Sequence, residues 1–471
     1  MSDALPKGWA NPALGEVVEI TSGNSKLTKK KYTSEGKFVA FSGSGPDGLV
    51  DFFEYEGHAI ILSAVGARCG KCFKADGKWV AIANTSIIRV LDDDPFLYEY
   101  LFYLLNNEDF WPKGGSAQPF VQTGKAKAET IIPLPPLAEQ KRIVAKLEKV
   151  LEKVDASRAR LDKIPRLLKR FRQSVLAAAC SGKLTADWRE ENACPEDATA
   201  LLDRMKEERR KRCLAENGKR KYREADSVVN EDLPNIPVTW CWTNFDHCSW
   251  EITVGHVGPM RDRYVEEGVT FLRCQNVKPL RFSEKGLVSI PADFHAQLSK
   301  SELLGGEILV VRSGANTGDC CVFPRNNGAA NCSDLVITRP LSGLCSEYGA
   351  LCVNSPMGQE LLSLSQTGIA QPHFNIGAMR IKAFPLPPFL EQQEIVRRVE
   401  ELFALADQLE ARYAKAKAQI DRLTQSILAK AFRGELVPQD PTDEPASVLL
   451  ARLRSATPAS KVRKKRAQSK E

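Results

Sequence analysis

The chain has 471 residues, of which 43% are hydrophobic and 27% are charged, and its formal net charge is +7. This length exceeds what one ordinary core accommodates and suits two to four domains of a globular protein. No window approaches the roughly 18 apolar residues of a membrane span, and the opening MSDALPKGWANP lacks the apolar core of a secretion signal, so we expect a cytoplasmic protein. Thirteen thinly spread cysteines favour reduced thiols over a disulfide framework.

The first part of the chain predicts a domain of mixed α and β structure. A basic cluster, KLTKKK, occupies Lys26–Lys31, and short apolar runs broken by glycine and asparagine follow at 58–91. Such runs are typical of strands joined by tight turns, and PFLYEYLFYLLNN at Pro95–Asn107 is typical of a helix.

A long helix is predicted after Pro135–Pro136, which stop any earlier helix. Its apolar positions alternate in steps of four and three, the spacing of a coiled-coil seam. Pro165 lacks a backbone donor and should kink or split this helix, and Gly182 is expected to terminate it. The predicted seam comprises Ile143, Leu147, Val150, Val154, Leu161, Ile164, Leu168 and Phe171.

A second globular unit and a second long helix follow. Alternating apolar runs at 306–341 predict strands, and EYGALCVNSPMGQELLSL at Glu347–Leu364 predicts a helix. The second long helix starts after Pro387–Pro388, and Gly434 is expected to terminate it. Its predicted seam comprises Ile395, Val399, Leu402, Leu409, Tyr413, Ile420, Leu423 and Ile427.

The two halves of the chain share an internal repeat. PLPPLAEQKRIV at Pro133–Val144 and PLPPFLEQQEIV at Pro385–Val396 lie 252 positions apart, and with this shift 21 of the 52 positions from Pro133 to Leu184 are identical. Weaker echoes lie upstream: LPKGW matches IPVTW at a shift of 231, and IILSAVGARCGKC matches ILVVRSGANTGDC at a shift of 248. We therefore expect an α+β protein in which two similar mixed α/β domains alternate with two long helices.

One chain can satisfy two such seams by folding them against each other, which predicts an intramolecular antiparallel coiled coil with pseudo-two-fold symmetry. In a register where facing residue numbers sum to 570, every small residue faces a larger one, as constant layer volume requires. The pairs in this register include Val154 with Ala416, Ser157 with Tyr413 and Ile164 with Ala406. The alternative is that each helix packs only on its own domain.

Signals for catalysis are weak throughout the sequence. GSGPDG at Gly43–Gly48 fits a dinucleotide-binding pattern, but Pro46 lies within it and no helix pattern follows, which favours a turn. Cys69 and Cys72 form a lone CxxC, and the five histidines show no metal-ligand spacing. Leu134 and Leu386 precede the two double prolines, and Leu137 and Phe389 follow them. Methyltransferases that act on base amino groups carry Asp or Asn before the double proline and an aromatic residue after it, so the amide or carboxylate that holds the amine is missing here. We therefore predict no catalytic, metal or cofactor site in this chain.

The two hinge-and-helix segments closely resemble the two conserved regions of specificity subunits from type I restriction-modification systems, and LPKGW resembles the start of their first target recognition domain. This resemblance covers the whole architecture and is weak inside the globular domains. It implies a non-catalytic subunit that recognises a bipartite DNA target through two recognition domains held apart by a coiled-coil ruler. It also implies two modification subunits, which bind S-adenosylmethionine and methylate adenine, and two restriction subunits that use ATP and Mg.

The resemblance divides the chain into four regions. They are a first target recognition domain (1–136), a first conserved helical region (137–225), a second target recognition domain (226–388), and a second conserved helical region with a basic tail (389–471). The basic stretch Lys206–Arg223 and the repeated segments ATALLDRM and SVLLARL are expected docking surfaces for partner subunits, with plain solvated helices as the alternative.

Contacts with DNA need Lys or Arg for phosphates and Arg, Asn or Gln for base edges. In the first domain the candidates are Lys26, Lys29, Lys30, Lys31, Arg68 and Gln118. In the second domain they are Arg261, Arg263, Arg273, Gln275, Asn276, Arg312 and Asn316. For each of them the alternative is a solvated surface residue or a hydrogen-bonding turn residue.

Two other functions compete with DNA recognition. The first is a coiled-coil scaffold that holds two protein-binding domains, which would bind proteins and leave DNA unbound. The second is a self-contained methyltransferase, which would require the isolated chain to bind S-adenosylmethionine. We expect neither behaviour.

Overall fold

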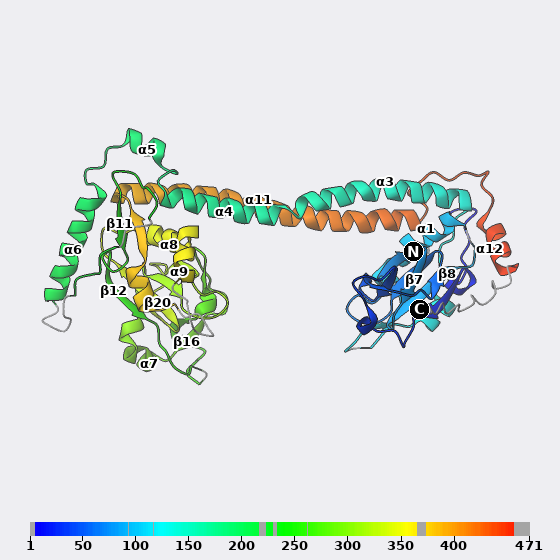
Figure 1. Ribbon diagram of the computed structural model, residues 1–471, viewed down its shortest axis with the longest axis horizontal. Helices are drawn as coiled ribbons and strands as arrows, with labels where there is room; N and C mark the ends of the chain where they lie inside the picture. Colours follow the sequence, from blue (N-terminus) through cyan, green and yellow to red (C-terminus); the bar gives the residue numbers. More distant parts are fainter. Residues whose placement is uncertain are drawn as a thin grey trace. The chain divides into compact units, whose positions relative to one another are not determined.

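The structure is a computed structural model that describes residues 5–92, 94–115, 117–215, 223–228, 233–260, 262–364 and 374–455. The chain forms two compact units: unit 1 runs to Asp162 and resumes at Ala414, and unit 2 comprises Lys163–Tyr413. Each unit holds one domain of mixed α and β structure and a pair of long helix segments, so the expected α+β class is confirmed (Figure 1).

The domain of unit 1 contains two four-stranded sheets. The first has the order β1-β8-β5-β6 with antiparallel neighbours, and the second has the order β3-β2-β7-β4, in which β2 and β7 run parallel. The strands are β1 Val18–Ser22, β2 Phe38–Ser42, β3 Gly45–Val50, β4 Tyr55–Glu56, β5 Ala59–Ser63, β6 Cys72–Ala75, β7 Lys78–Ala81, β8 Thr85–Val90, β9 Lys113–Gly114 and β10 Phe120–Val121. All five residues of β5 are buried, which places the centre of the core there.

Two helices complete this domain, α1 (Pro95–Leu105) and α2 (Thr123–Glu129). The α1 helix begins where the sequence predicts, because Asp94 caps it by accepting hydrogen bonds from the backbone N–H groups of Phe96 and Leu97 and Pro95 stands in its first turn.

The domain of unit 2 repeats this architecture. Its main sheet has the order β12-β20-β17-β18, which matches β1-β8-β5-β6 strand for strand, and β13 pairs in parallel with β19 as β2 does with β7. The strands are β11 Cys241–Asn244, β12 Ser249–Val254, β13 Val269–Leu272, β14 Val277–Lys278, β15 Arg281–Phe282, β16 Val288–Ile290, β17 Ile308–Val311, β18 Cys320–Val322, β19 Ala330–Cys332, β20 Leu335–Pro340 and β21 Ala383–Leu386. The internal duplication therefore extends through the globular parts.

The helices of this domain are α7 (Ala292–Gln297), α8 (Ser346–Asn354), α9 (Pro356–Leu364) and α10 (Ile376–Ile381). The single helix expected at Glu347–Leu364 is split into α8 and α9 at Ser355. The reason is Pro356, which disfavours a helical conformation at the residue before it.

Three long helices, α3 (Leu137–Leu161), α4 (Ile164–Cys180) and α11 (Phe389–Phe432), carry the predicted seams. The first helix is split immediately before Pro165, as its missing backbone donor predicts. In unit 1, Arg158 of α3 pairs with Asp421 (3.0 Å) and Asp162 with Lys417 (3.6 Å). One residue number rises as the other falls, so α3 and the last part of α11 are antiparallel.

Unit 2 shows the same orientation for α4 and the first part of α11. Arg172 pairs with Asp407 (2.5 Å) and Glu410 (2.9 Å), and Arg398 donates a hydrogen bond to the carbonyl of Leu184, just past α4 (2.9 Å). Figure 1 shows these segments side by side in each unit. The predicted antiparallel coiled coil is confirmed.

The predicted register of this coiled coil is wrong. Three of its ion pairs join residues whose numbers sum to 579, nine more than expected. Nine residues correspond to about 13.5 Å along a helix, beyond the reach of an Arg–Asp pair. Sliding one helix along the other by seven residues brings each seam layer onto the next layer of the partner helix. Side-chain size alone therefore does not distinguish neighbouring registers.

Two predicted seam residues also lie outside the buried stripe. Leu409 is 42% exposed and Leu423 is 49% exposed, whereas the other predicted seam residues are buried or half-buried. From Ile420 the stripe takes a four-residue step to Thr424 and a three-residue step to Ile427, the reverse of the predicted order. Because two helices cover only one face of each other, a change of step turns Leu423 outward.

A glycine that lies against the start of a domain follows the end of α4 and the end of α11. Gly182 and Gly434 have positive φ angles of 75° and 74°. A Cβ on Gly182 would lie 2.4 Å from Cγ of Pro237, and a Cβ on Gly434 would lie 2.4 Å from Cγ of Pro6. Since Pro6 and Pro237 are related by the 231-residue shift, the two junctions are equivalent, and both expected terminators are confirmed.

The remaining helices are α5 (Ala186–Glu191), α6 (Ala198–Ala215) and α12 (Ala446–Ser455). The backbone N–H of Ala198 donates to the carbonyl of Thr239 (3.1 Å), and that of Ala446 donates to the carbonyl of Gly8 (2.9 Å). The inward-facing apolar residues of α6 and α12 are buried in the chain's own cores: Ala198, Leu201, Leu202, Met205, Ala446, Leu449, Leu450 and Leu453. These residues cannot form the expected docking surfaces, because they are already covered, whereas Val448 is 41% exposed. Residues 216–222 of the basic stretch and the basic tail lie outside the described residues.

Candidate nucleic-acid interface

In the domain of unit 1, three loops meet around the turn that joins β7 to β8. The N–H groups of Gly23 and Asn24 donate to the carbonyls of Thr85 and Ala81 (2.9 and 2.8 Å), and the N–H of Ala64 donates to the carbonyl of Asn84 (2.9 Å). The loop after β1 and the loop after β5 therefore both contact this turn. Gly23 permits the close approach, since a Cβ there would lie 2.3 Å from the carbonyl oxygen of Ile82.

A third loop, described at residues 115 and 117–121, joins the same group. The N–H of Gly66 donates to the carbonyl of Pro119, and the N–H of Val121 donates to the carbonyl of Ala64, both at 2.9 Å. Arg68 is exposed and donates to the carbonyl of Ser44 (3.4 Å), which adds the β2–β3 turn. We call this group of loops the first loop surface: residues 23–32, 43–45, 64–71, 82–85, 115 and 117–121.

All six predicted DNA contacts of the first domain lie on the first loop surface, and all six are exposed. Lys29 is not a simple solvated cation, because its ammonium group pairs with Asp47 at 2.5 Å. Burial opposes ionisation of Asp47, but hydrogen bonds from Lys29, Ser42 and Tyr32 outweigh it and lower the pKa of this carboxyl group. Asp47 thus anchors the Lys29–Lys31 turn to β2 and β3, while Lys26, Lys30 and Lys31 make no ion pair with the described residues.

The domain of unit 2 repeats this arrangement. The N–H of Gly255 donates to the carbonyl of Leu335, the N–H of His256 donates to the carbonyl of Cys332, and the N–H of Arg312 donates to the carbonyl of Asp334 (2.8, 2.8 and 3.3 Å). These bonds are the counterparts of those made by Gly23, Asn24 and Ala64. We call residues 255–260, 262–265, 273–276, 312–318 and 333–334 the second loop surface.

The structure places the predicted contacts of the second domain in different surroundings. Asn276 is fully buried, its amide donates to the carbonyls of Ser283 and Lys285, and its oxygen accepts the N–H of Arg273. Its side chain therefore holds a turn and cannot reach a base edge. The sequence alone does not reveal this structural role. Arg261 lies outside the described residues.

The other candidates lie on the second loop surface. Arg263 is exposed and stacks over Phe294 (5.0 Å), while Arg273 and Gln275 both donate to the carbonyl of Gly286. Arg312 lies 3.6 Å from the carboxylate of Asp334. Asn316 is exposed in the loop between the positive-φ residues Gly314 and Gly318, the counterparts of Gly66 and Gly70.

Sequence reasoning missed the residue at the centre of each surface. Asn84 and Asp334 occupy equivalent turn positions and have φ angles of 67° and 56°, which non-glycine residues rarely adopt. The available signal was an asparagine between two predicted strands in IANTSII, because Asn and Asp tolerate this conformation best among residues with a side chain.

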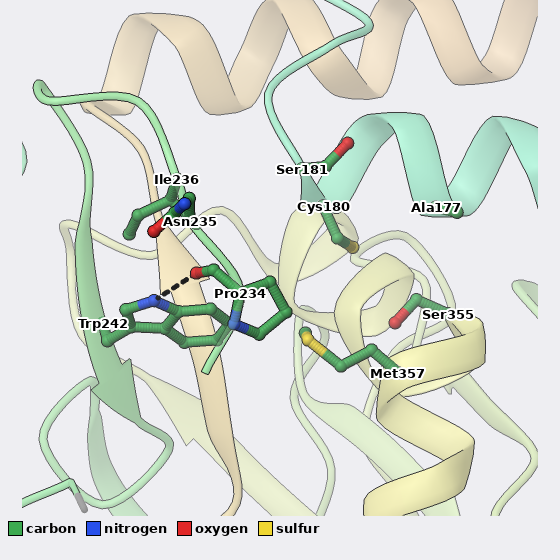
Figure 2. A pocket seen from close by; sticks show the side chains of 9 residues that line it. All are labelled: Ala177, Cys180, Ser181, Pro234, Asn235, Ile236, Trp242, Ser355 and Met357. Atoms are coloured by element: carbon green, nitrogen blue, oxygen red, sulfur yellow. Dashed lines mark hydrogen bonds between the residues drawn. The ribbon is translucent and has the colours of Figure 1, made fainter. Parts of the chain in front are cut away.

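The cysteines, the possible metal ligands and the cavities bear on whether the chain could hold a catalytic or metal site. All thirteen cysteines are free, and within the described ranges no group of three or more His, Cys, Asp or Glu could hold a metal ion. Figure 2 shows a cavity of about 140 Å³ in unit 2, beside the end of α4. Its lining side chains include Cys180, Trp242 and Met357, and none of them is Asp, Glu, His, Lys or Arg.

Comparison with known proteins identifies this architecture. The family model of the type I restriction modification DNA specificity domain matches residues 6–166. The specificity subunit of the type I restriction enzyme EcoDI from Escherichia coli is 29% identical over 482 residues, which cover 97% of each chain. The EcoBI specificity subunit of Escherichia coli is 32% identical over 347 residues, which cover 70% of this chain and 65% of the relative.

The chain belongs to the specificity subunits of type I restriction-modification systems. A solved structure from work on assembly and conformational transition of a type I restriction-modification system supports the fold: its TM-score is 0.63 at 22% identity, and the match covers 92% of this chain and 100% of that one. Among the described residues of this specificity subunit, no helix has the length and apolar character that crossing a membrane requires.

Proposed function

We propose that this specificity subunit recognises a bipartite target in double-stranded DNA, with one half-site for each loop surface. The observation that carries the proposal is the duplication of one loop architecture with different side chains. Both surfaces use the same backbone hydrogen bonds around an Asn84 or Asp334 turn, yet the first presents Lys30, Lys31 and Arg68 where the second presents Arg263 and Arg312. Equivalent frames with different polar groups suit two half-sites of different sequence.

The chemistry would reside in partner subunits. On this proposal the chain supplies no catalytic residue and recruits two modification subunits, which bind S-adenosylmethionine and methylate adenine, and two restriction subunits that use ATP and Mg. The complex would act in the cytoplasm. Partner docking would use polar faces of the conserved helical regions, since the apolar faces of α6 and α12 are already covered.

The proposal is tested by mapping methylated adenines in the genome of cells that carry the native complex, and then measuring binding. The complex, purified through a tag on this chain, should bind a duplex with the mapped split site far more tightly than the same duplex with either half scrambled. A complex that binds proteins but no duplex would favour the scaffold alternative. Retention of S-adenosylmethionine by the isolated chain would favour a self-contained methyltransferase.

A further inference from the structure

Asn84 and Asp334 are held in a costly backbone conformation by equivalent surroundings. A left-handed conformation is unfavourable for an L-residue, and glycine would avoid this cost. Each of the two turns nevertheless carries a polar side chain at this position. Equivalent hydrogen bonds fix both turns, because the loop after β1 or β12 and the loop after β5 or β17 donate to them.

The Asn84 side chain is available for an external partner. It is exposed, its amide makes no hydrogen bond with the described residues, and the loops that carry Lys26–Lys31 and Arg68 flank its turn. An amide has one acceptor and two donors, the set that pairs with N6 and N7 of adenine in the major groove. Cationic side chains on both sides would hold the phosphates of the same duplex.

The Asp334 side chain is differently engaged. Its carboxylate accepts a hydrogen bond from the hydroxyl of Ser313 and lies 3.6 Å from the guanidinium of Arg312. Cys274 also donates to the carbonyl of Asp334 (3.4 Å). Asp334 is therefore engaged by groups of its own loop, although its side chain is 38% exposed. Arg312, whose side chain is 28% exposed, is the group beside it that has donors for a base edge.

We propose that this turn is a specificity-determining position in both domains: Asn84 contacts a base edge of the first half-site, and Asp334 is a positioning residue that aims Arg312 at a base of the second half-site. The inference rests on the proposed DNA recognition and adds which side chain reads a base.

Replacing Asn84 by glycine tests the contribution of the side chain separately from that of the backbone conformation. Asn84→Gly keeps the left-handed turn without strain and removes only the amide. In the native complex we expect discrimination at one base pair of the first half-site to fall roughly ten-fold, with every other position of the mapped target unchanged. Asp76→Ala, an exposed turn residue at the other end of β7, is the matched control and should leave the target unchanged.

Asn84→Asp provides a second readout, since a carboxylate accepts from N4 of cytosine but cannot donate to adenine N7. The preferred base at the affected position should therefore change. In the second domain, Asp334→Asn and Arg312→Ala should relax the same single base pair, whereas a purely structural Asp334 would weaken all positions together.

The outcomes separate this inference from the proposed function. A wild-type complex without sequence preference would overturn DNA recognition itself. A wild-type complex with a defined target that Asn84→Gly leaves intact would overturn the role of Asn84 alone. Different affected positions for Asp334→Asn and Arg312→Ala would overturn the positioning role.

Discussion

At the scale of single residues, one contact between a tryptophan and a glutamate is made twice and supported differently each time. The indole N–H of Trp9 donates to Glu139 (2.9 Å), and that of Trp240 donates to Glu391 (2.8 Å). Glu391 is also bonded to Arg189 and Thr185, whereas the further partner of Glu139 is the neutral amide of Gln439. Each contact ties the start of a domain to the first turn of a long helix.

Replacing Glu391 should destabilise unit 2. Glu391→Ala leaves the guanidinium of Arg189 and the buried indole N–H of Trp240 without this partner, and loss of one member of a buried pair costs about 3–5 kcal/mol. Urea unfolding with hydrogen exchange would measure the loss and assign it to unit 2. The control is Glu401→Ala in the same helix, which removes an exposed ion pair with Arg397 and should cost less than about 1 kcal/mol. Equal losses would contradict this reading.

The environment of Glu139 predicts that the stability of the folded chain depends on pH. Burial raises the pKa of its carboxyl group above 4.5, although hydrogen bonds from Trp9 and Gln439 lower it in part. The folded chain therefore keeps this proton to a higher pH than the unfolded chain does. The contribution of Glu139 to the free energy of unfolding is fully present below the unfolded-state pKa of 4.5, and it is lost as the pH rises through the folded-state pKa. Glu139→Gln cannot ionise, and the free energy of unfolding of wild type relative to this variant should fall across that window. Parallel pH profiles would refute the expectation.

At the scale of elements, the ends of the helices were predictable from the sequence, whereas the buried faces of the long helices were not. Pro165 splits a helix through its missing backbone donor and Pro356 through the restricted conformation of the residue before it, and Gly182 and Gly434 end helices for an equally local reason. Which residues of α11 are buried depends on a partner helix far away in the sequence. A four-three alternation therefore predicted the stripe but misplaced Leu409 and Leu423.

Truncations along α11 should reveal its buried face. Ile395→Ala, at a fully buried position, should cost about 2–5 kcal/mol through lost burial and a residual cavity. Leu409→Ala and Leu423→Ala remove side chains that are 42% and 49% exposed and should cost less than about 1 kcal/mol. Chemical unfolding of the three variants measures these free-energy changes. Large losses of stability for Leu409→Ala and Leu423→Ala would support the strict heptad seam instead.

At the scale of the whole molecule, the duplication was visible in the sequence while the proposed DNA-contacting groups were only partly visible. Repeated hinges and helices identify two domains because their packing demands are shared. The loop surfaces diverge, and Asn276 shows why composition alone misleads: a buried turn residue and a base-reading residue are the same amino acid until the fold assigns their neighbours. Asn84 was missed for the converse reason, since a turn residue looked merely structural.

The salt dependence of DNA binding provides the last prediction. Each lysine that neutralises a phosphate contributes about 0.9 to the slope of log K against log salt concentration. Lys30→Ala with Lys31→Ala should therefore reduce the slope for the native complex by about 1.8. Lys29→Ala should reduce it less, because Asp47 already pairs with this ammonium group. The control is Lys78→Ala, which removes an exposed cation at the opposite end of β7 from the Asn84 turn. A slope that falls as much for Lys78→Ala would mean that binding follows overall charge and not the first loop surface.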